Sequence, residues 1–76
     1  MKAEIISKPY CPYCTKAKNL LELSNIPYTE KILYEDLSKE QLLERVPEAK
    51  TVPQIWIDDN HIGGYDELVE FLKTLV

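Results

Sequence analysis

Residues that form disulfides or bind structural metals are scarce in this chain of 76 residues, which has two cysteines and one histidine. Glycine is also rare, at two residues. A chain of this length buries only about 60–65% of its unfolded surface, so disulfides, metals or oligomerisation commonly assist. Cys11 and Cys14 are three positions apart, and a bond between them closes too small a loop to constrain the unfolded chain much. With His61 they supply at most three soft ligands, whereas a closed structural zinc site needs four. We therefore expect no metal.

Basic charge and long apolar runs are also scarce. The chain has nine lysines and arginines and 13 acidic residues. The resulting net charge of -4 disfavours nucleic-acid and anionic-membrane partners. No apolar run approaches the ~18 residues of a transmembrane helix, and no signal-peptide pattern opens the chain. We expect a cytoplasmic, monomeric protein. In a reducing cytoplasm a cysteine pair is more often catalytic or metal-binding than structural.

Hydrophobic periodicity predicts one domain over residues 1–76 with the element order β-α-β-α-β-β-α. The predicted elements are a strand over 2–7, a helix over 12–25, a strand over 28–34, a short helix after Ser38, strands over 54–58 and 61–62, and a final helix with Leu68, Phe71, Leu72 and Leu75 on one face. This order is typical of an α/β domain whose central sheet is covered by helices. The first βαβ unit should be parallel and the final hairpin antiparallel, so the sheet should be mixed.

The short middle helix has a clear start signal. Ser38 and Gln41 have the spacing of a capping box, and Leu37 and Leu42 that of a hydrophobic staple. Pro47 should end the helix. Its buried residues are predicted to be Leu42, Leu43 and Val46.

The cysteine pair lies where a loop becomes a helix. Cys11 is at the predicted cap, so its sulfur can face unpaired N–H groups of the first turn and the positive end of the helix dipole. Lys8 adds a full positive charge nearby. Both effects lower the pKa of the Cys11 thiol and make it the nucleophile. Cys14 lies one turn further along, on the apolar face, where burial keeps it a thiol. We expect Cys11 to be exposed and Cys14 sheltered.

This asymmetry predicts an order of events. Cys11 attacks a substrate disulfide, and Cys14 then displaces the product and closes the Cys11–Cys14 bridge. A Cys-x-x-Cys pair alone is as typical of half a metal site as of redox chemistry. Here no second pair completes a zinc site, and the pair follows a strand and opens a helix, which favours the redox interpretation.

Three separated motifs, in order and spacing, resemble the glutaredoxins, small dithiol members of the thioredoxin-fold superfamily. They are Lys8-Pro9-Tyr10-Cys11-Pro12-Tyr13-Cys14, Thr51-Val52-Pro53 and Gly63-Gly64-Tyr65-Asp66. The resemblance covers essentially the whole chain and is closest to the compact bacterial or phage type. Thioredoxins usually carry Trp-Cys-Gly-Pro-Cys, and that tryptophan is absent. The implied fold is thioredoxin-like, with a mixed four-stranded sheet and three helices.

The resemblance also implies a glutathione site. Val52–Pro53 should be a cis peptide, which would present the Val52 backbone to glutathione in a strand-like manner. Lys8 would face the glycine carboxylate, and Asp66, at a helix N-terminus, the γ-glutamyl end. Supporting roles are expected for Lys8, Pro12, Tyr13 and Pro53. The residues implied to bind glutathione are Lys8, Tyr13, Thr51, Val52, Pro53, Gly64, Tyr65 and Asp66.

Each of these residues also has a plainer interpretation. Asp66 alone would pass as a helix cap, Lys8 as a solvated lysine and the Gly63–Gly64 pair as a strand terminator. Their joint occurrence around a Cys-x-x-Cys pair favours one shared groove. Trp56 is interpreted as sheet packing, and His61 as a hairpin residue without a catalytic role.

The chain departs from the family pattern at two places. Tyr65 stands where many glutaredoxins have a further cysteine. Family members also direct a glutamine or a basic residue of the second helix toward the glycine carboxylate. The candidates here are Glu40, Gln41 and Lys50, and the sequence does not choose among them.

The leading hypothesis is a glutathione-dependent thiol–disulfide oxidoreductase that uses glutathione as co-substrate and reduces glutathione mixed disulfides and protein disulfides. Ribonucleotide reductase is a candidate client by family analogy alone. One alternative is an electron donor coupled to thioredoxin reductase that does not use glutathione. Another is an iron–sulfur carrier that binds a cluster between two protomers through Cys11 and glutathione. Pro12 stiffens the loop and Cys14 offers a competing disulfide, which both disfavour the cluster.

Overall fold

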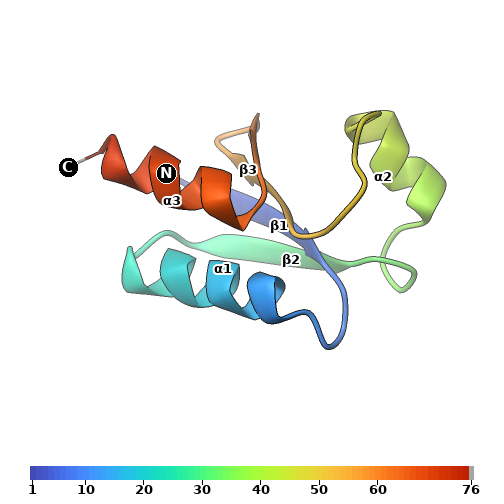
Figure 1. The fold of residues 1–76 in the computed structure, drawn as a ribbon, viewed down its shortest axis with the longest axis horizontal. Coiled ribbons are helices and arrows are strands. Elements are labelled where there is room, and N and C mark those ends of the chain that lie inside the picture. Colours follow the sequence, from blue (N-terminus) through green and yellow to red (C-terminus); the bar gives the residue numbers. More distant parts are fainter. Residues whose placement is uncertain (76) are drawn as a thin grey trace.

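A mixed four-stranded sheet forms the centre of the structure, a computed structural model that describes residues 1–75 (Figure 1). Its strands, in the spatial order β2-β1-β3-β4, are β1 (Ala3–Ser7), β2 (Tyr28–Ile32), β3 (Gln54–Ile57) and β4 (Asn60–Gly63). β1 pairs parallel with β2 and antiparallel with β3, and β3 pairs antiparallel with β4. The predicted element order and the mixed sheet are confirmed.

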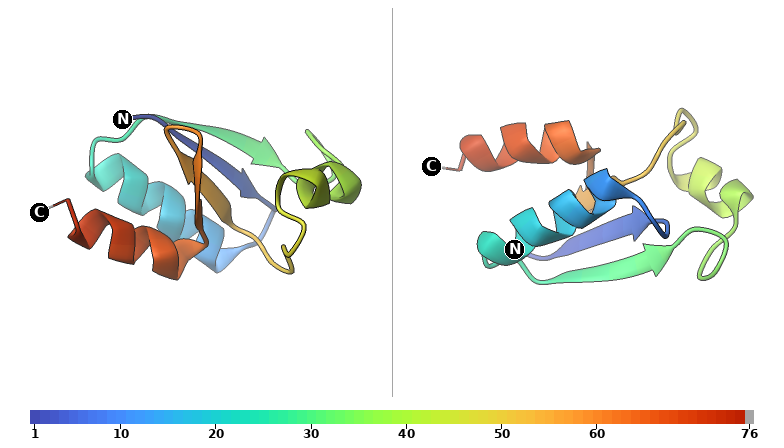
Figure 2. Two further views of the ribbon diagram at one scale, coloured as in Figure 1. Left: turned by 90° about the horizontal axis from the view of Figure 1, so that it is seen from above. Right: turned by 60° about the horizontal axis from the view of Figure 1, so that its bottom comes forward.

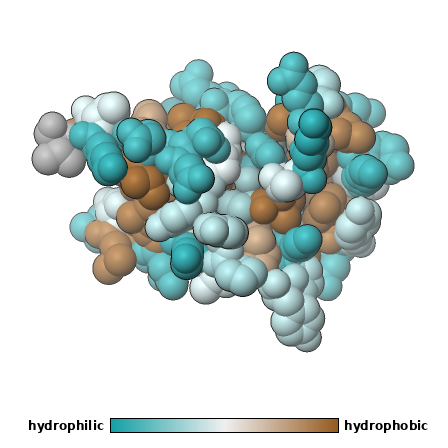
Figure 3. All heavy atoms as spheres, in the orientation of Figure 1, coloured by the Kyte–Doolittle hydropathy of each residue, from teal (hydrophilic) through white to brown (hydrophobic). Residues whose placement is uncertain are grey.

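Three helices flank the sheet: α1 (Pro12–Leu23), α2 (Lys39–Arg45) and α3 (Tyr65–Lys73). α1 and α3 run side by side over one face, whereas α2 lies beyond the end of the sheet (Figure 2). Teal, hydrophilic residues predominate on the outer sides of α2 and α3 in the view of Figure 3. Within residues 1–75, no helix combines the length and the apolarity needed to cross a membrane.

The apolar residues form two clusters because strand side chains alternate between the faces of the sheet. The larger cluster lies under α1 and α3, and its buried members are Ala3, Ile5, Ala17, Leu21, Ile26, Ile55, Ile57 and Leu68. The smaller lies toward α2, and its buried members are Ile6, Leu33, Leu42, Val46 and Trp56. Trp56 therefore packs on the sheet, as predicted. The larger cluster holds α1 and α3 against the sheet, and with them the two helix N-termini of the candidate site.

α1 begins and ends at signals that the sequence contains. Pro12 occupies its first position, where a missing N–H costs nothing. At the other end Asn25 adopts a left-handed φ of 58°, the Ile26 N–H donates to the Leu21 carbonyl and the Asn25 N–H to the Glu22 carbonyl. This is a Schellman motif. It ends the helix at Leu23, two residues before the predicted boundary.

β2 is shorter than predicted because the chain turns directly after it. It ends at Ile32 and not at Tyr34, whose φ of 73° lies in the left-handed region. The Asp36 carboxylate accepts a hydrogen bond from the Ile32 N–H at 2.8 Å, which satisfies the last strand amide within the turn. A short-range polar contact thus outweighs the β propensity of the residues around Tyr34.

α2 starts as predicted. The Gln41 N–H donates to Ser38 Oγ at 3.1 Å, and the Ser38 N–H donates to Gln41 Oε1 at 2.7 Å, which completes the capping box. Leu37 and Leu42 pack in the same cluster, consistent with the staple. The prediction that Leu43 is buried was wrong: it is half-buried, because the short helix turns only one narrow face to the sheet.

The hairpin and the last helix differ in detail from prediction. Asp58 and Asp59 both have positive φ, 50° and 68°, which makes a two-residue hairpin turn, so Asn60 already belongs to β4. α3 ends at Lys73, and Leu75 is 52% exposed. The prediction that Leu75 lies on the buried face was wrong, because the helical periodicity stops before it.

An ion-pair cluster joins α2 to β1 on the outer face of the sheet. Arg45 makes two hydrogen bonds of 2.8 Å to the Glu4 carboxylate, and Lys31 lies 3.3 Å from the same group. The Arg45 guanidinium also lies 3.9 Å from the centre of the Trp56 ring. The hydrogen bonds from Arg45, followed by those from Lys31, lower the pKa of Glu4, although partial burial opposes them.

This cluster predicts a pH-dependent contribution to stability. Because the folded pKa of Glu4 lies below its unfolded value, the contribution is complete above the unfolded pKa and is lost as pH falls through the folded pKa. Glu4→Gln should lower the free energy of unfolding at pH 7 by roughly 0.5–1 kcal/mol, since the pair is partly exposed to solvent. Urea unfolding at a series of pH values should show this deficit shrinking below about pH 4.5.

Glu44→Gln is the matched control. Glu44 is exposed on α2 and takes part in none of the ion pairs among residues 1–75. Its variant should match the parent protein at every pH. A deficit in Glu4→Gln that stays constant down to acid pH would contradict the ion-pair account.

Candidate active site

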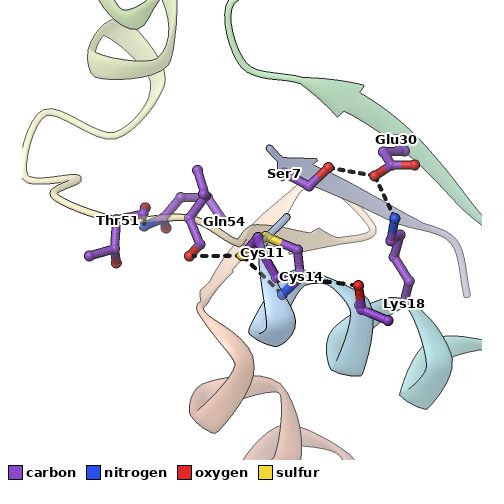
Figure 4. Close-up of a disulfide and its surroundings, with 9 residues drawn as sticks. Ser7, Cys11, Cys14, Lys18, Glu30, Thr51 and Gln54 are labelled. Atoms are coloured by element: carbon purple, nitrogen blue, oxygen red, sulfur yellow. Dashed lines mark hydrogen bonds and ion pairs between the residues drawn. A yellow bond between two sulfur atoms is a disulfide. The ribbon is translucent and has the colours of Figure 1, made fainter. Parts of the chain in front are cut away.

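Cys11 and Cys14 form a disulfide at the start of α1 (Figure 4). Cys11 is the N-cap residue, with extended backbone, and the Cys14 N–H donates to its sulfur at 3.2 Å. The chain enters this cap through Tyr10, which adopts a left-handed φ of 58°. The Cys11 sulfur therefore faces the positive end of the helix dipole, as the sequence predicted.

The two sulfurs differ in accessibility less than the sequence suggested. Cys14 is 1% exposed, which agrees with a sheltered thiol, but Cys11 is only 9% exposed. The expectation of a freely exposed Cys11 was wrong for the disulfide form. Its sulfur is bonded to Cys14 and lies 3.9 Å from the Val52 carbonyl oxygen, and both neighbours cover it. An incoming sulfur atom reaches Cys11 more readily than Cys14.

The peptide bond Val52–Pro53 is cis, as the resemblance implied. It precedes β3 and carries the Val52 backbone past the disulfide. Within residues 1–75, neither the N–H nor the C=O of Val52 is bonded to another backbone group. These groups form a short strand edge beside Cys11 that can pair with an extended peptide.

A hollow of about 320 Å³ lies on one side of Val52. The rings of Tyr13 and Tyr65 lie next to each other in its wall, with centroids 6.0 Å apart and planes inclined by 42°. The N-terminus of α3 opens into this hollow, and helix N–H groups there favour a carboxylate. The predicted site residues that line it are Tyr13, Thr51, Val52, Pro53, Gly64, Tyr65 and Asp66.

A second hollow, of about 210 Å³, lies on the other side of Val52 and is basic. Lys8, Lys39 and Lys50 line it, together with Thr51 and Val52, where the two hollows meet. Of the three candidates for a carboxylate contact, only Lys50 lies here. The Gln41 side chain is engaged by the capping box, and Glu40 does not line the hollow. The effect of Lys8 on the Cys11 thiol stays a prediction.

Sequence reasoning missed two groups at these hollows. Glu67 accepts a hydrogen bond from the N–H of the N-cap residue Gly64 at 2.7 Å, which caps α3. The spacing of three residues from Gly64 is that of a capping box and was a usable signal. Lys39 was missed because it is the first residue of α2, and nothing in the sequence places it near Lys8.

Polar contacts behind the disulfide hold the end of β1, from which the loop over residues 8–11 leads to the disulfide. Ser7, the last residue of β1, is buried, and its hydroxyl donates to Glu30 at 2.5 Å. Lys18 of α1 pairs with the same carboxylate at 2.9 Å (Figure 4). The Ser7 hydroxyl, followed by Lys18, lowers the pKa of Glu30 against the effect of burial. These bonds link β1, β2 and α1 close to Cys14.

The arrangement is chemically suited to two-electron exchange. A dithiol beside a helix N-terminus can close to a disulfide and reopen by thiolate attack through a mixed disulfide. Among residues 1–75, no three histidine, cysteine or acidic side chains gather as metal ligands.

Several known proteins are similar to this chain. The glutaredoxin family model matches residues 3–62. Glutaredoxin 1 of Rickettsia conorii is 43% identical over 65 residues, which are 83% of this chain and 64% of the relative. The chain thus spans just under two thirds of that relative's length.

Solved structures show the same thioredoxin-like fold. Reduced Escherichia coli glutaredoxin superposes with a TM-score of 0.83 at 37% identity, covering 97% of this chain and 95% of that one. A buckwheat glutaredoxin–glutathione complex gives 0.78 at 28% identity, covering 95% and 68%. The predicted fold and the family resemblance are confirmed, and the chain belongs to the glutaredoxin family.

Proposed function

We propose that this chain is a glutathione-dependent thiol–disulfide oxidoreductase. The observation that carries the proposal is the redox pair at a helix N-terminus beside the free Val52 edge, with a basic hollow on one side and a helix N-terminus on the other. Glutathione is an extended tripeptide with a carboxylate at each end and a thiol in the middle, and this groove matches that order of groups. The buckwheat relative binds glutathione.

The proposed reaction begins on Cys11. Its thiolate attacks the glutathione sulfur of a mixed disulfide, a new sulfur–sulfur bond forms, and the client thiolate leaves and takes up a proton. A second glutathione thiolate then attacks the same glutathione sulfur, which releases oxidised glutathione and the Cys11 thiolate. For a protein disulfide, the Cys11 thiolate attacks one client sulfur, and the other client sulfur leaves as a thiolate and takes up a proton. Cys14 then loses its proton and attacks the Cys11 sulfur, which releases the second client thiolate and leaves Cys11 and Cys14 joined as a disulfide. Two glutathione molecules re-reduce them.

The groove would hold glutathione by its backbone and its two ends. The Val52 N–H and C=O pair with the central residue in the manner of an added strand. The first-turn N–H groups of α3 take the γ-glutamyl carboxylate, and Asp66 takes its ammonium. Lys8, aided by Lys50, takes the glycine carboxylate. Protein clients, ribonucleotide reductase among them, rest on family resemblance alone.

The roles of the two cysteines predict different variant phenotypes. Cys11→Ser should lose at least about a hundredfold in turnover of a small glutathione mixed disulfide, because it lacks the nucleophile. Cys14→Ser should keep turnover within about threefold, since that reaction needs only Cys11. The same variant should fail to reduce a protein disulfide catalytically. A coupled assay with glutathione reductase measures the first reaction, and insulin reduction the second.

The binding of the γ-glutamyl end predicts a role for Asp66. Asp66→Asn should raise KM for the mixed disulfide about three- to tenfold with little change in kcat, because it removes a charge-assisted contact made before and during the reaction. The effect should weaken as salt rises. Glu70→Gln, which removes a charge one turn further along α3, should leave KM unchanged.

The alternatives give other outcomes. No reduction of the disulfide form by glutathione, with ready reduction by thioredoxin reductase, would favour the glutathione-independent donor. Visible absorption after anaerobic reconstitution with iron and sulfide, in a dimer, would favour the cluster carrier.

A further inference from the structure

Gln54 is a buried polar residue that joins the loop beside the disulfide to the outer face of the sheet. It is the first residue of β3 and follows Pro53, and only 8% of it is exposed. Its Nε2 donates to the Thr51 carbonyl at 2.9 Å, and its Oε1 lies 2.8 Å from His61 Nε2 on β4. Neither Gln54 nor His61 lines the two hollows beside Val52.

The hydrogen-bond pattern determines the proton position on His61. The Thr51 carbonyl can only accept, so the amide group that faces it must be the Gln54 NH₂. The Gln54 oxygen then faces His61, and His61 Nε2 must carry a hydrogen and donate it.

The Thr51 carbonyl and the Val52 N–H belong to one peptide group. Because a trans peptide is planar, its C=O and N–H point in opposite directions. Holding the carbonyl against Gln54 therefore sets the direction of the Val52 N–H. Val52 in turn lines both hollows and lies next to the Cys11 sulfur.

His61 is itself held in place by the outer face of the sheet. Its ring centre lies 5.1 Å from that of Trp56, which is its cross-strand partner. The Arg45 guanidinium stacks over the Trp56 ring, and Arg45 donates two hydrogen bonds to the Glu4 carboxylate. A continuous set of contacts thus runs from the ion-pair cluster on α2 and β1 to the peptide that precedes Val52.

We propose that Gln54 and His61 are positioning residues for substrate binding: His61 orients the Gln54 amide, and Gln54 aims the Val52 N–H at the substrate backbone. This inference rests on the proposed function for the identity of the substrate. It assigns His61 a role that the sequence did not suggest. His61 acts through Gln54 and does not contact the substrate in the groove.

Two variants remove the network at different points. His61→Phe keeps a ring against Trp56 but lacks the N–H donor, and Gln54→Leu removes the amide with little change of volume. Each should raise KM for a glutathione mixed disulfide about three- to tenfold, the cost of a misdirected hydrogen bond, with kcat within about twofold. His61→Gln, which restores a side-chain NH₂, should recover most of the loss.

Backbone ¹⁵N relaxation tests the same network without glutathione. In His61→Phe and Gln54→Leu the order parameter of the Val52 N–H should fall from about 0.85 toward 0.6, while those of Ile55 and Ile57 stay at the rigid value. Ser38→Ala is the matched control, because it removes a hydrogen bond at the start of α2 without touching Thr51. It should change neither KM nor the Val52 order parameter.

The outcomes separate this inference from the proposed function. An unchanged Val52 order parameter in both variants, or an equal rise in KM in Ser38→Ala, would overturn the positioning role. Absence of turnover of a glutathione mixed disulfide by the unmodified protein would overturn the proposed function instead, and the relaxation data would still decide whether Gln54 and His61 hold Val52.

Discussion

The hydrogen bond from the Cys14 amide to the Cys11 sulfur is the contact around which the candidate site is arranged. It places one sulfur at the N-terminus of α1, where amide groups and the helix dipole favour negative charge. The second cysteine follows one turn later and is buried among the residues that attach α1 to the sheet. The start of α1 therefore makes the environments of the two cysteines different and also brings their sulfur atoms within bonding distance.

Strand directions bring the other parts of the site to that helix start. β3 runs antiparallel to β1, so its first residue, Gln54, pairs with Ile6 near the end of β1. β4 runs antiparallel to β3, so its last residue, Gly63, pairs with Ile55 near the start of β3. The loop to α1, the cis peptide and the start of α3 consequently lie at one end of the sheet. The three segments are separated in the chain, and only the sheet brings them together.

The two faces of the sheet have different tasks. The face under α1 and α3 is apolar and holds both helices in place. On the outer face, Glu4, Arg45, Trp56 and His61 contact one another in series, and Gln54 continues the series to Thr51. Polar groups that are buried on that face are all paired among the residues described, which is what a rigid loop beside a reacting sulfur requires.

Much of this protein was readable from local sequence. Helical periodicity and the capping box of Ser38 and Gln41 act within a few residues, so element order and the start of α2 were predicted. The motifs around Cys11, Val52 and Gly64 indicated the family.

Helix and strand ends were missed where a local hydrogen bond or turn ended the element early, as at Asn25 and Asp36. Only the tertiary structure decided that Cys11 is nearly covered, that Lys39 lines the same hollow as Lys8, and that His61 is linked through Gln54 to the Thr51–Val52 peptide. These depend on strand register and on how elements pack, because the residues involved meet only when segments distant in the chain are brought together.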